Sequence, residues 1–162
     1  MIECKEYALK LITFKDRTEK ELIERLKEKK FSEENIEATV EFMKEYGYIN
    51  DKSYTERYVS DCVKLKAWGK NRIRKELLYK GIERELIDKK LDELQFDTRE
   101  ILEKEMEKRF KNADFENPKQ RARIFSYFAR RGYSLSEIRG AINNFCSFED
   151  ILNDDWEVWA CQ

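Results

Sequence analysis

The sequence predicts an all-α protein built as an elongated array of three tandem three-helix repeats. Two observations predict this class. First, 41% of the 162 residues are charged and 41% are apolar, with five Gly and one Pro, a composition that suits long helices and is poor for sheets and turns. Second, the apolar pattern recurs at an offset of 51 residues without gaps, which is the signature of tandem repeats.

Six positions are apolar in all three copies of the repeat. Within a copy they are mostly four or five residues apart, which predicts two amphipathic helices joined by a tight corner, because positions three and four apart share a helix face. The three sets are Leu22, Leu26, Phe31, Ile36, Val40 and Met43; Ile73, Leu77, Ile82, Ile87, Leu91 and Leu94; and Ile124, Phe128, Tyr133, Ile138, Ile142 and Phe145.

The corner after the second helix of each copy has a glycine in two of the three repeats. Gly81 and Gly132 occupy equivalent positions, where a left-handed residue that ends a helix costs least as glycine. Lys30 stands there in the first copy. The period therefore predicts either a positive φ at Lys30 or a first corner of different shape.

Capping signals mark where the second helices begin. We expect these starts near Thr18, Gly69 and Pro118. Thr18 and Glu21 have the spacing of a capping box, and Asn117 before Pro118 resembles an N-cap followed by proline in the first turn.

A preceding helix is expected to complete each unit. Its predicted apolar stripe repeats at the same offset in the first two copies, whereas the third copy is shifted by about one residue and is followed by a looser connection over 111–117. The stripes are Tyr7, Leu11 and Phe14; Tyr58, Cys62 and Leu65; and Leu102, Met106 and Phe110.

We therefore divide the chain into repeats at 1–50, 51–96 and 97–148, followed by an acidic tail at 149–162. The tail has five acids and no base. Trp156 and Trp159 favour packing of the tail against the third repeat, because two exposed indoles would form an apolar surface patch. The alternative is a mobile peptide.

The residue types argue against an enzyme. The sequence has no histidine, which excludes Ser-His and Cys-His nucleophile pairs, and no glycines have phosphate-loop spacing. The acids at 33, 34, 37 and 41 have the spacing of a solvated helix face. Four scattered cysteines indicate neither a zinc site nor a disulfide framework, so we expect no cofactor.

Basic charge gathers on the second helices of repeats two and three. Residues 64–80 carry seven bases and one acid, and 119–131 carry five bases and no acid. The corresponding segment of repeat one, 19–30, has five bases and four acids, so folding does not require this contrast. A one-sided basic patch is typical of nucleic-acid binding. The hypothetical nucleic-acid or filament contacts are Lys64, Lys66, Lys70, Arg72, Lys75, Tyr79, Arg121, Arg123, Arg130 and Arg131.

Within this set, Arg72, Lys75 and Tyr79 are expected to face solvent or a partner, away from the apolar stripe. Lys70 and Arg72 correspond to Glu19 and Glu21 of repeat one. The period therefore predicts that both positions tolerate an acid. An ordinary solvated face remains the alternative for any single basic residue.

Three separated segments resemble the RecX family. Residues 47–51 read Gly-Tyr-Ile-Asn-Asp, residues 69–82 contain Ile-Arg-Lys-Glu-Leu-Leu-Tyr-Lys-Gly-Ile, and residues 127–133 read Tyr-Phe-Ala-Arg-Arg-Gly-Tyr. The similarity covers about residues 8–145. Tyr54-Thr55 replaces a usual Phe-Ala, and the sequence after Phe148 matches no pattern of the family.

The resemblance implies a modulator of the RecA recombinase, which binds the groove of the RecA nucleoprotein filament and inhibits ATP hydrolysis and strand exchange. Direct binding to single- or double-stranded DNA is also implied. We expect a cytoplasmic monomer without a membrane span. The alternatives are a sequence-specific helical DNA-binding regulator and a helical adaptor that binds protein alone.

Overall fold

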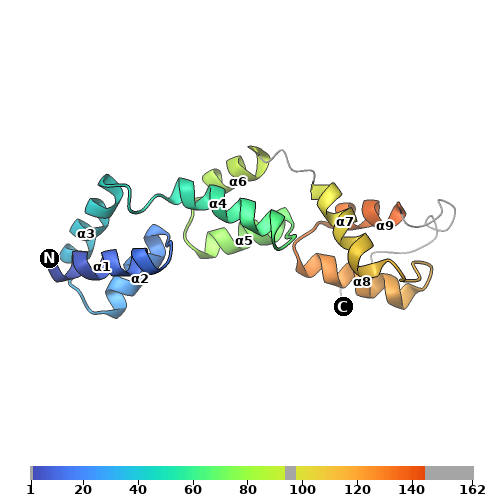
Figure 1. Ribbon diagram of the computed structural model, residues 1–162, viewed down its shortest axis with the longest axis horizontal. Coiled ribbons are helices and arrows are strands. Elements are labelled where there is room, and N and C mark those ends of the chain that lie inside the picture. Colours follow the sequence, from blue (N-terminus) through green and yellow to red (C-terminus); the bar gives the residue numbers. More distant parts are fainter. Residues whose placement is uncertain (1, 94–97, 145–162) are drawn as a thin grey trace. The chain divides into compact units, whose positions relative to one another are not determined.

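The computed structural model describes residues 2–93 and 98–144, which form nine helices and no strand (Figure 1). The predicted all-α class with three tandem three-helix domains is confirmed. The helices are α1 (Ile2–Phe14), α2 (Glu19–Glu28), α3 (Glu33–Glu45), α4 (Asp51–Lys64), α5 (Lys70–Tyr79), α6 (Arg84–Glu93), α7 (Thr98–Phe110), α8 (Pro118–Arg130) and α9 (Leu135–Asn143).

The helix ends reproduce the 51-residue period. Helices α2, α5 and α8 end at this interval, and α3, α6 and α9 begin at it. At its start α8 is longer by one turn, because Asn117 caps it and Pro118 fits the first turn. The Oδ1 atom of Asn117 accepts the N–H groups of Lys119 and Gln120 at 3.0 and 3.4 Å.

The corners also follow the period. Gly81 and Gly132 have φ angles of 85° and 88°, and Lys30 has a φ of 65°. The prediction of a left-handed Lys30 is therefore confirmed. The first corner keeps the shape of the other two at the expense of backbone strain in a residue with a Cβ atom.

The predicted stripe of the first helices is confirmed in part. Cys62, Leu102 and Met106 are buried, and Tyr7, Leu11 and Phe110 pack against the cores. Phe14 and Leu65 are 88% and 79% exposed, whereas the small side chains of Cys4 and Ala8 are buried. Large apolar residues near the helix ends misled the assignment. The buried positions of the first helices recur at an offset of 51 residues in all three copies, so the third copy is not shifted. One row is Cys4, Thr55 and Met106, and the next is Ala8, Val59 and the half-buried Phe110.

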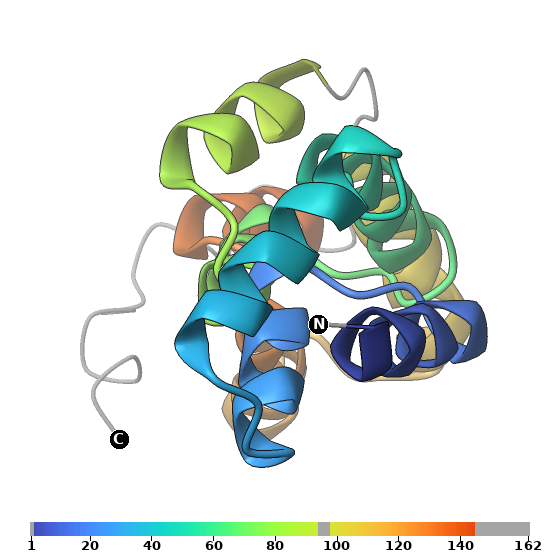
Figure 2. The ribbon, with the colours of Figure 1, turned by 90° about the vertical axis from the view of Figure 1, so that its left-hand side faces the viewer.

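The chain folds as two compact units. The N-terminal unit contains described residues 2–60 and 74–93, and the C-terminal unit contains 61–73 and 98–144. In the first, α1, α2 and α3 pack around Leu22, Leu26 and Met43 (Figure 2). In the second, α7 and α8 pack with α9 around Met106 and Phe128. The repeat boundaries given above remain predictions.

Within the described ranges, no helix is long and apolar enough to cross a membrane, and no group of three or more Cys, Asp or Glu residues could hold a metal ion. Cys4 and Cys62 are buried. The acidic tail at 149–162, with Trp156 and Trp159, lies outside the described residues.

Candidate nucleic-acid interface

The two units differ in charge. The sequence at 61–73 and 95–144 carries fifteen Lys and Arg residues against nine Asp and Glu, whereas 1–60 and 74–94 carry eighteen against twenty. Up to residue 144 the C-terminal unit therefore has a net charge of +6, against −2 for the N-terminal unit, and the candidate interface lies in this basic part; residues 145–162 add five acids and no base.

A junction between two helix ends organises this unit. The N–H of Gly69 donates to the carbonyl of Arg131 at 2.8 Å, and the N–H of Asn71 donates to the carbonyl of Gly132 at 3.2 Å. The first amides of α5 thus bind the last carbonyls of α8, and each helix end satisfies groups that the other leaves without an intrahelical partner. We call this contact the Gly69 joint. Because its amides are engaged, the start of α5 is not an open phosphate site.

Trp68 lies beside this joint with two cations over its ring. The Arg72 guanidinium carbon is 4.0 Å from the ring centroid, and the Lys66 Nζ is 4.5 Å from it. Arg72 also donates from Nη1 to the carbonyl of Arg130 at 3.1 Å. We call Lys66, Trp68, Arg72 and Arg130 the Trp68 cluster.

The loop that carries Trp68 is fixed at several points. Ala67 has a φ of 49°, and the Tyr133 hydroxyl donates to its carbonyl at 3.2 Å. Burial raises the pKa of the Tyr133 phenol, so it remains protonated and able to donate. The N–H of Trp68 donates to the carbonyl of Cys62 at 3.1 Å. The loop therefore presents its lysines from a rigid base.

The predicted basic residues of the C-terminal unit differ in exposure. Lys64, Lys66, Arg123 and Arg130 are exposed, and Lys70 is half-buried. Arg131 is half-buried too, with its guanidinium carbon 4.4 Å from the Tyr127 ring centroid.

One expectation about the basic residues needs correction, and a second needs a fuller description. Arg121 is only 9% exposed, because it precedes Ile124 by three residues and Phe128 by seven and so lies on the core side of α8. Arg72 is half-buried against Trp68 and does not simply face solvent. Lys75 and Tyr79 are exposed as predicted, but both belong to the N-terminal unit.

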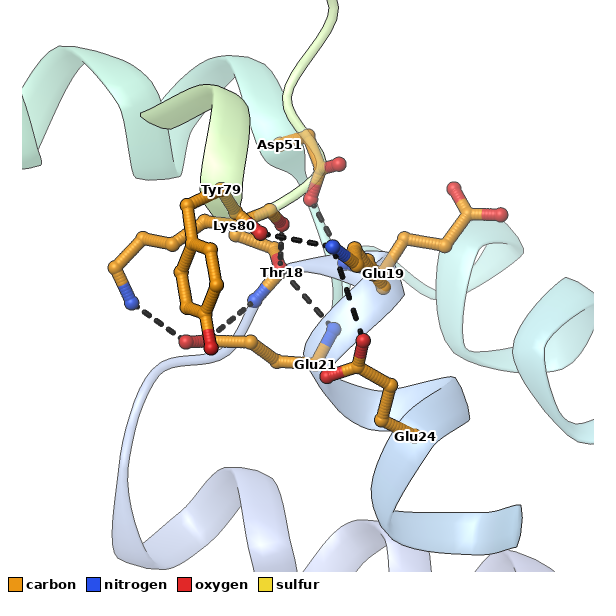
Figure 3. Close-up of polar contacts among 8 residues, drawn as sticks. Thr18, Glu19, Glu21, Glu24, Asp51, Tyr79 and Lys80 are labelled. Carbon is orange, nitrogen blue, oxygen red and sulfur yellow. Dashed lines mark hydrogen bonds and ion pairs between the residues drawn. The ribbon is translucent and has the colours of Figure 1, made fainter. Parts of the chain in front are cut away.

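The N-terminal unit contains the counterpart of the Gly69 joint (Figure 3). The Oγ1 of Thr18 donates to the carbonyl of Lys80 at 2.7 Å, and the Nζ of Lys20 donates to the carbonyl of Tyr79 at 2.9 Å. Thr18 and Lys80 precede Gly69 and Arg131 by 51 residues each. The start of α2 therefore meets the end of α5 with side-chain donors in place of backbone amides. We call this contact the Thr18 joint.

An ion pair closes the Thr18 joint. Lys80 Nζ lies 2.5 Å from Glu21 Oε1, with both side chains largely buried. Burial is the largest single effect and disfavours both charges, but the surrounding hydrogen bonds and opposite charges together outweigh it: the pKa of Lys80 is raised, and that of Glu21, which also accepts the Thr18 N–H, is lowered. Beside them, burial raises the pKa of Asp51, whose Oδ1 accepts the N–H of Glu19 at 3.0 Å.

Sequence reasoning missed Trp68 as a member of the site. Its signal was present, since an aromatic residue followed by glycine lies between Lys66 and Lys70. The candidate residues were chosen mainly by charge, so Trp68 was left out although Lys66 and Arg72 lie over its ring.

Comparison with known proteins identifies all three repeats. Family models described as the first, second and third three-helix domains of RecX match residues 4–43, 50–91 and 97–142. This chain belongs to the RecX family. The RecX models account for α1 to α9, and the expectation drawn from the three sequence motifs is confirmed.

Named relatives agree with this assignment. The Regulatory protein RecX of Clostridium perfringens (strain 13) is 32% identical over 88% of this chain and 70% of its own length. The Regulatory protein RecX of Clostridium beijerinckii is 33% identical over 82% of this chain, which spans only 63% of that relative.

Two solved RecX structures share the fold. The crystal structure of RecX from Lactobacillus salivarius has a TM-score of 0.71 at 23% identity and covers 88% of this chain and 94% of its own. A crystal structure of regulatory protein RecX has a TM-score of 0.75 at 22% identity, with coverages of 88% and 72%.

Proposed function

We propose that this RecX-family chain binds the RecA nucleoprotein filament along its groove and inhibits RecA ATP hydrolysis and strand exchange, thereby modulating recombination and DNA repair. Membership of a family whose members are named regulatory proteins supports a regulator and not an enzyme. The observation that carries the DNA part of the proposal is the Trp68 cluster, in which Lys66 of the fixed loop and Arg72 of α5 lie over one aromatic ring and Arg72 also binds the carbonyl of Arg130.

The Trp68 cluster, together with the neighbouring Lys64, has the chemistry of a phosphate-contacting surface. Lys64 and Lys66 are exposed on either side of Leu65, and Arg130 is exposed at the end of α8. Exposed cations on a fixed backbone bind phosphates without first ordering a loop, and each neutralised phosphate releases condensed counterions. Trp68 orients Arg72 and Lys66 while offering an aromatic surface beside them.

A pair of substitutions tests this surface. Lys64→Ala with Lys66→Ala removes two exposed cations and leaves the Gly69 joint intact. If both contact phosphates, the slope of log affinity against log salt flattens by roughly 0.7 to 0.9 per lost contact, or about 1.4 to 1.8 in total. The measurement is DNA affinity across a salt series, paired with RecA ATP hydrolysis on single-stranded DNA.

Lys10→Ala with Lys15→Ala is the matched control. Both lysines are exposed on the N-terminal unit, and Lys15 occupies the repeat position of Lys66. The control keeps the wild-type slope and inhibition. An unchanged slope and undiminished inhibition in the Lys64 and Lys66 variant would show that these lysines form an ordinary solvated face and do not contact DNA. Loss of RecA inhibition without a change in slope would instead favour an adaptor that binds protein alone.

A further inference from the structure

An open groove crosses the N-terminal unit along α2, α3 and the start of α6. It consists of two adjoining hollows of about 810 and 470 Å³, which share Glu19, Ile23, Lys27 and Lys44 as lining residues. We call this continuous depression the α2–α3 groove. None of its lining residues belongs to the Trp68 cluster.

The groove has an apolar floor. Ile36, Val40 and Ile49 are buried beneath it, at 4%, 6% and 5% exposure, and Ile23 and Leu86 are half-buried. Aliphatic side chains from a partner would remove further apolar surface from water on these residues, at about 25 cal/mol per Å². The floor therefore favours a ligand with an apolar side.

One wall of the groove is a row of carboxylates. Glu33, Glu37 and Glu41 are spaced four residues apart on α3, so they share one helix face, and all three are exposed. Glu83 adds a carboxylate beside the other hollow. None of these four makes an ion pair in the part of the chain that the structure describes.

The lysines of the groove do not neutralise that wall. Lys44 pairs with Glu19 at 2.9 Å. Lys20 donates to the Tyr79 carbonyl and lies 3.8 Å from Glu24. Among the described lining residues, Lys27 is then the one cation without a carboxylate partner. The charge left for a ligand is negative.

We propose that the α2–α3 groove docks a basic amphipathic segment of a protein partner. Aliphatic side chains of the segment lie on Ile23, Val40 and Leu86, and its Lys or Arg side chains pair with Glu33, Glu37 and Glu41. A nucleic acid is repelled by this wall, so the groove and the Trp68 cluster bind chemically different ligands. The inference rests on the proposed function in one respect, namely that a RecA protomer supplies the segment.

Charge reversal of the wall tests the groove. The variant Glu33→Lys, Glu37→Lys, Glu41→Lys alters exposed side chains only, so helix content by circular dichroism stays at the wild-type level. We expect its affinity for RecA in the absence of DNA to fall by roughly tenfold or more, since three charge pairs turn repulsive. Its DNA affinity should stay equal or rise.

The matched control is Glu6→Lys, Glu34→Lys, Glu45→Lys. These three acids are equally exposed, do not line the groove, and include Glu34 in the same first turn of α3 as Glu33. The net charge changes by the same amount in both variants. Loss of RecA binding in the groove variant alone supports the groove, and equal binding by both variants overturns it while the proposed function stands.

A second probe separates the two proposals. If the wild-type chain neither binds RecA nor slows its ATP hydrolysis, the proposed function fails. Docking in the α2–α3 groove is then tested with a synthetic amphipathic helix of Lys and Leu as the ligand. In ¹⁵N-labelled full-length chain, amide shifts at Ile23, Val40 and Leu86 that vanish in the groove variant support the docking site. Shifts of the same size in wild type and groove variant overturn it.

Discussion

Gly69 and Gly132 lie so close together that a Cβ atom on Gly69 would stand 2.4 Å from the carbonyl oxygen of Gly132. The atoms in the way are backbone and cannot turn aside. We expect Gly69→Ala to lower the free energy of unfolding by about 1–3 kcal/mol. Gly140→Ala is the control, because its Cβ would meet open space within α9; it should raise stability by about 0.5–1 kcal/mol. Urea unfolding measures both, and equal midpoints would refute the close approach.

Positions 70 and 72, which the period treats alike, differ in the structure. Arg72 binds the Arg130 carbonyl and covers Trp68, whereas Lys70 has neither contact. Arg72→Glu should therefore cost about 1–3 kcal/mol of stability, and Lys70→Glu about 0.5 kcal/mol or less. Thermal unfolding of the two single variants checks this. Wild-type stability in Arg72→Glu would mean that the position accepts an acid as its counterpart Glu21 does.

The ion pair of the Thr18 joint makes stability depend on acid pH. Burial opposes ionisation of Glu21, but the hydrogen bonds from Lys80 and the Thr18 N–H hold its pKa below the ordinary 4.5. Its contribution is present above pH 4.5 and is lost as the pH falls through the lower, folded-state pKa. Glu21→Gln should cost about 1–2 kcal/mol at pH 7 and progressively less towards pH 3.

Melting curves between pH 7 and pH 3 measure that difference. Glu24→Gln serves as control, because Glu24 lies exposed on the same helix with only a 3.8 Å contact to Lys20. A constant gap between wild type and Glu21→Gln across the whole pH range would contradict the role assigned to the ion pair.

The strained corner of repeat one can be relieved. Lys30 holds a φ of 65°, which glycine adopts without a Cβ penalty. Lys30→Gly should raise stability by about 1 kcal/mol. Lys29→Gly, at a residue with a φ of −76°, should lower it by up to about 1 kcal/mol. Chemical denaturation of the two variants decides the matter, and destabilisation by both would show that Lys30 is unstrained.

The period predicted the helix pairs well because burial repeats with it. Leu22, Ile73 and Ile124 all occupy the core, and the left-handed angle of Lys30 followed from its glycine counterparts. The first helices were predicted less well, since Cys4 and Ala8 are small and weakly apolar while Phe14, at a helix end, is large and exposed. In these helices the size of an apolar residue did not indicate that it is buried.

The candidate interface could be predicted only in part. Counting charges located the basic segments, but one partner of Arg72 is a carbonyl 58 residues away, which no local spacing reveals. Arg121 was misplaced because its charge was taken as a sign of exposure although its helical position is on the core side. The apolar floor of the α2–α3 groove likewise depends on Leu86, which belongs to the following repeat.

The joints have a consequence for the order of events during protein synthesis. The hydroxyl of Thr18 finds its acceptor, the Lys80 carbonyl, 62 residues later, and the start of α5 waits over a similar distance for the end of α8. At roughly 5–20 residues per second, a ribosome takes about 3–12 s to supply the missing acceptor. Repeats one and two therefore leave the exit tunnel with these donors still hydrogen-bonded to water, and the next repeat to emerge supplies their acceptors.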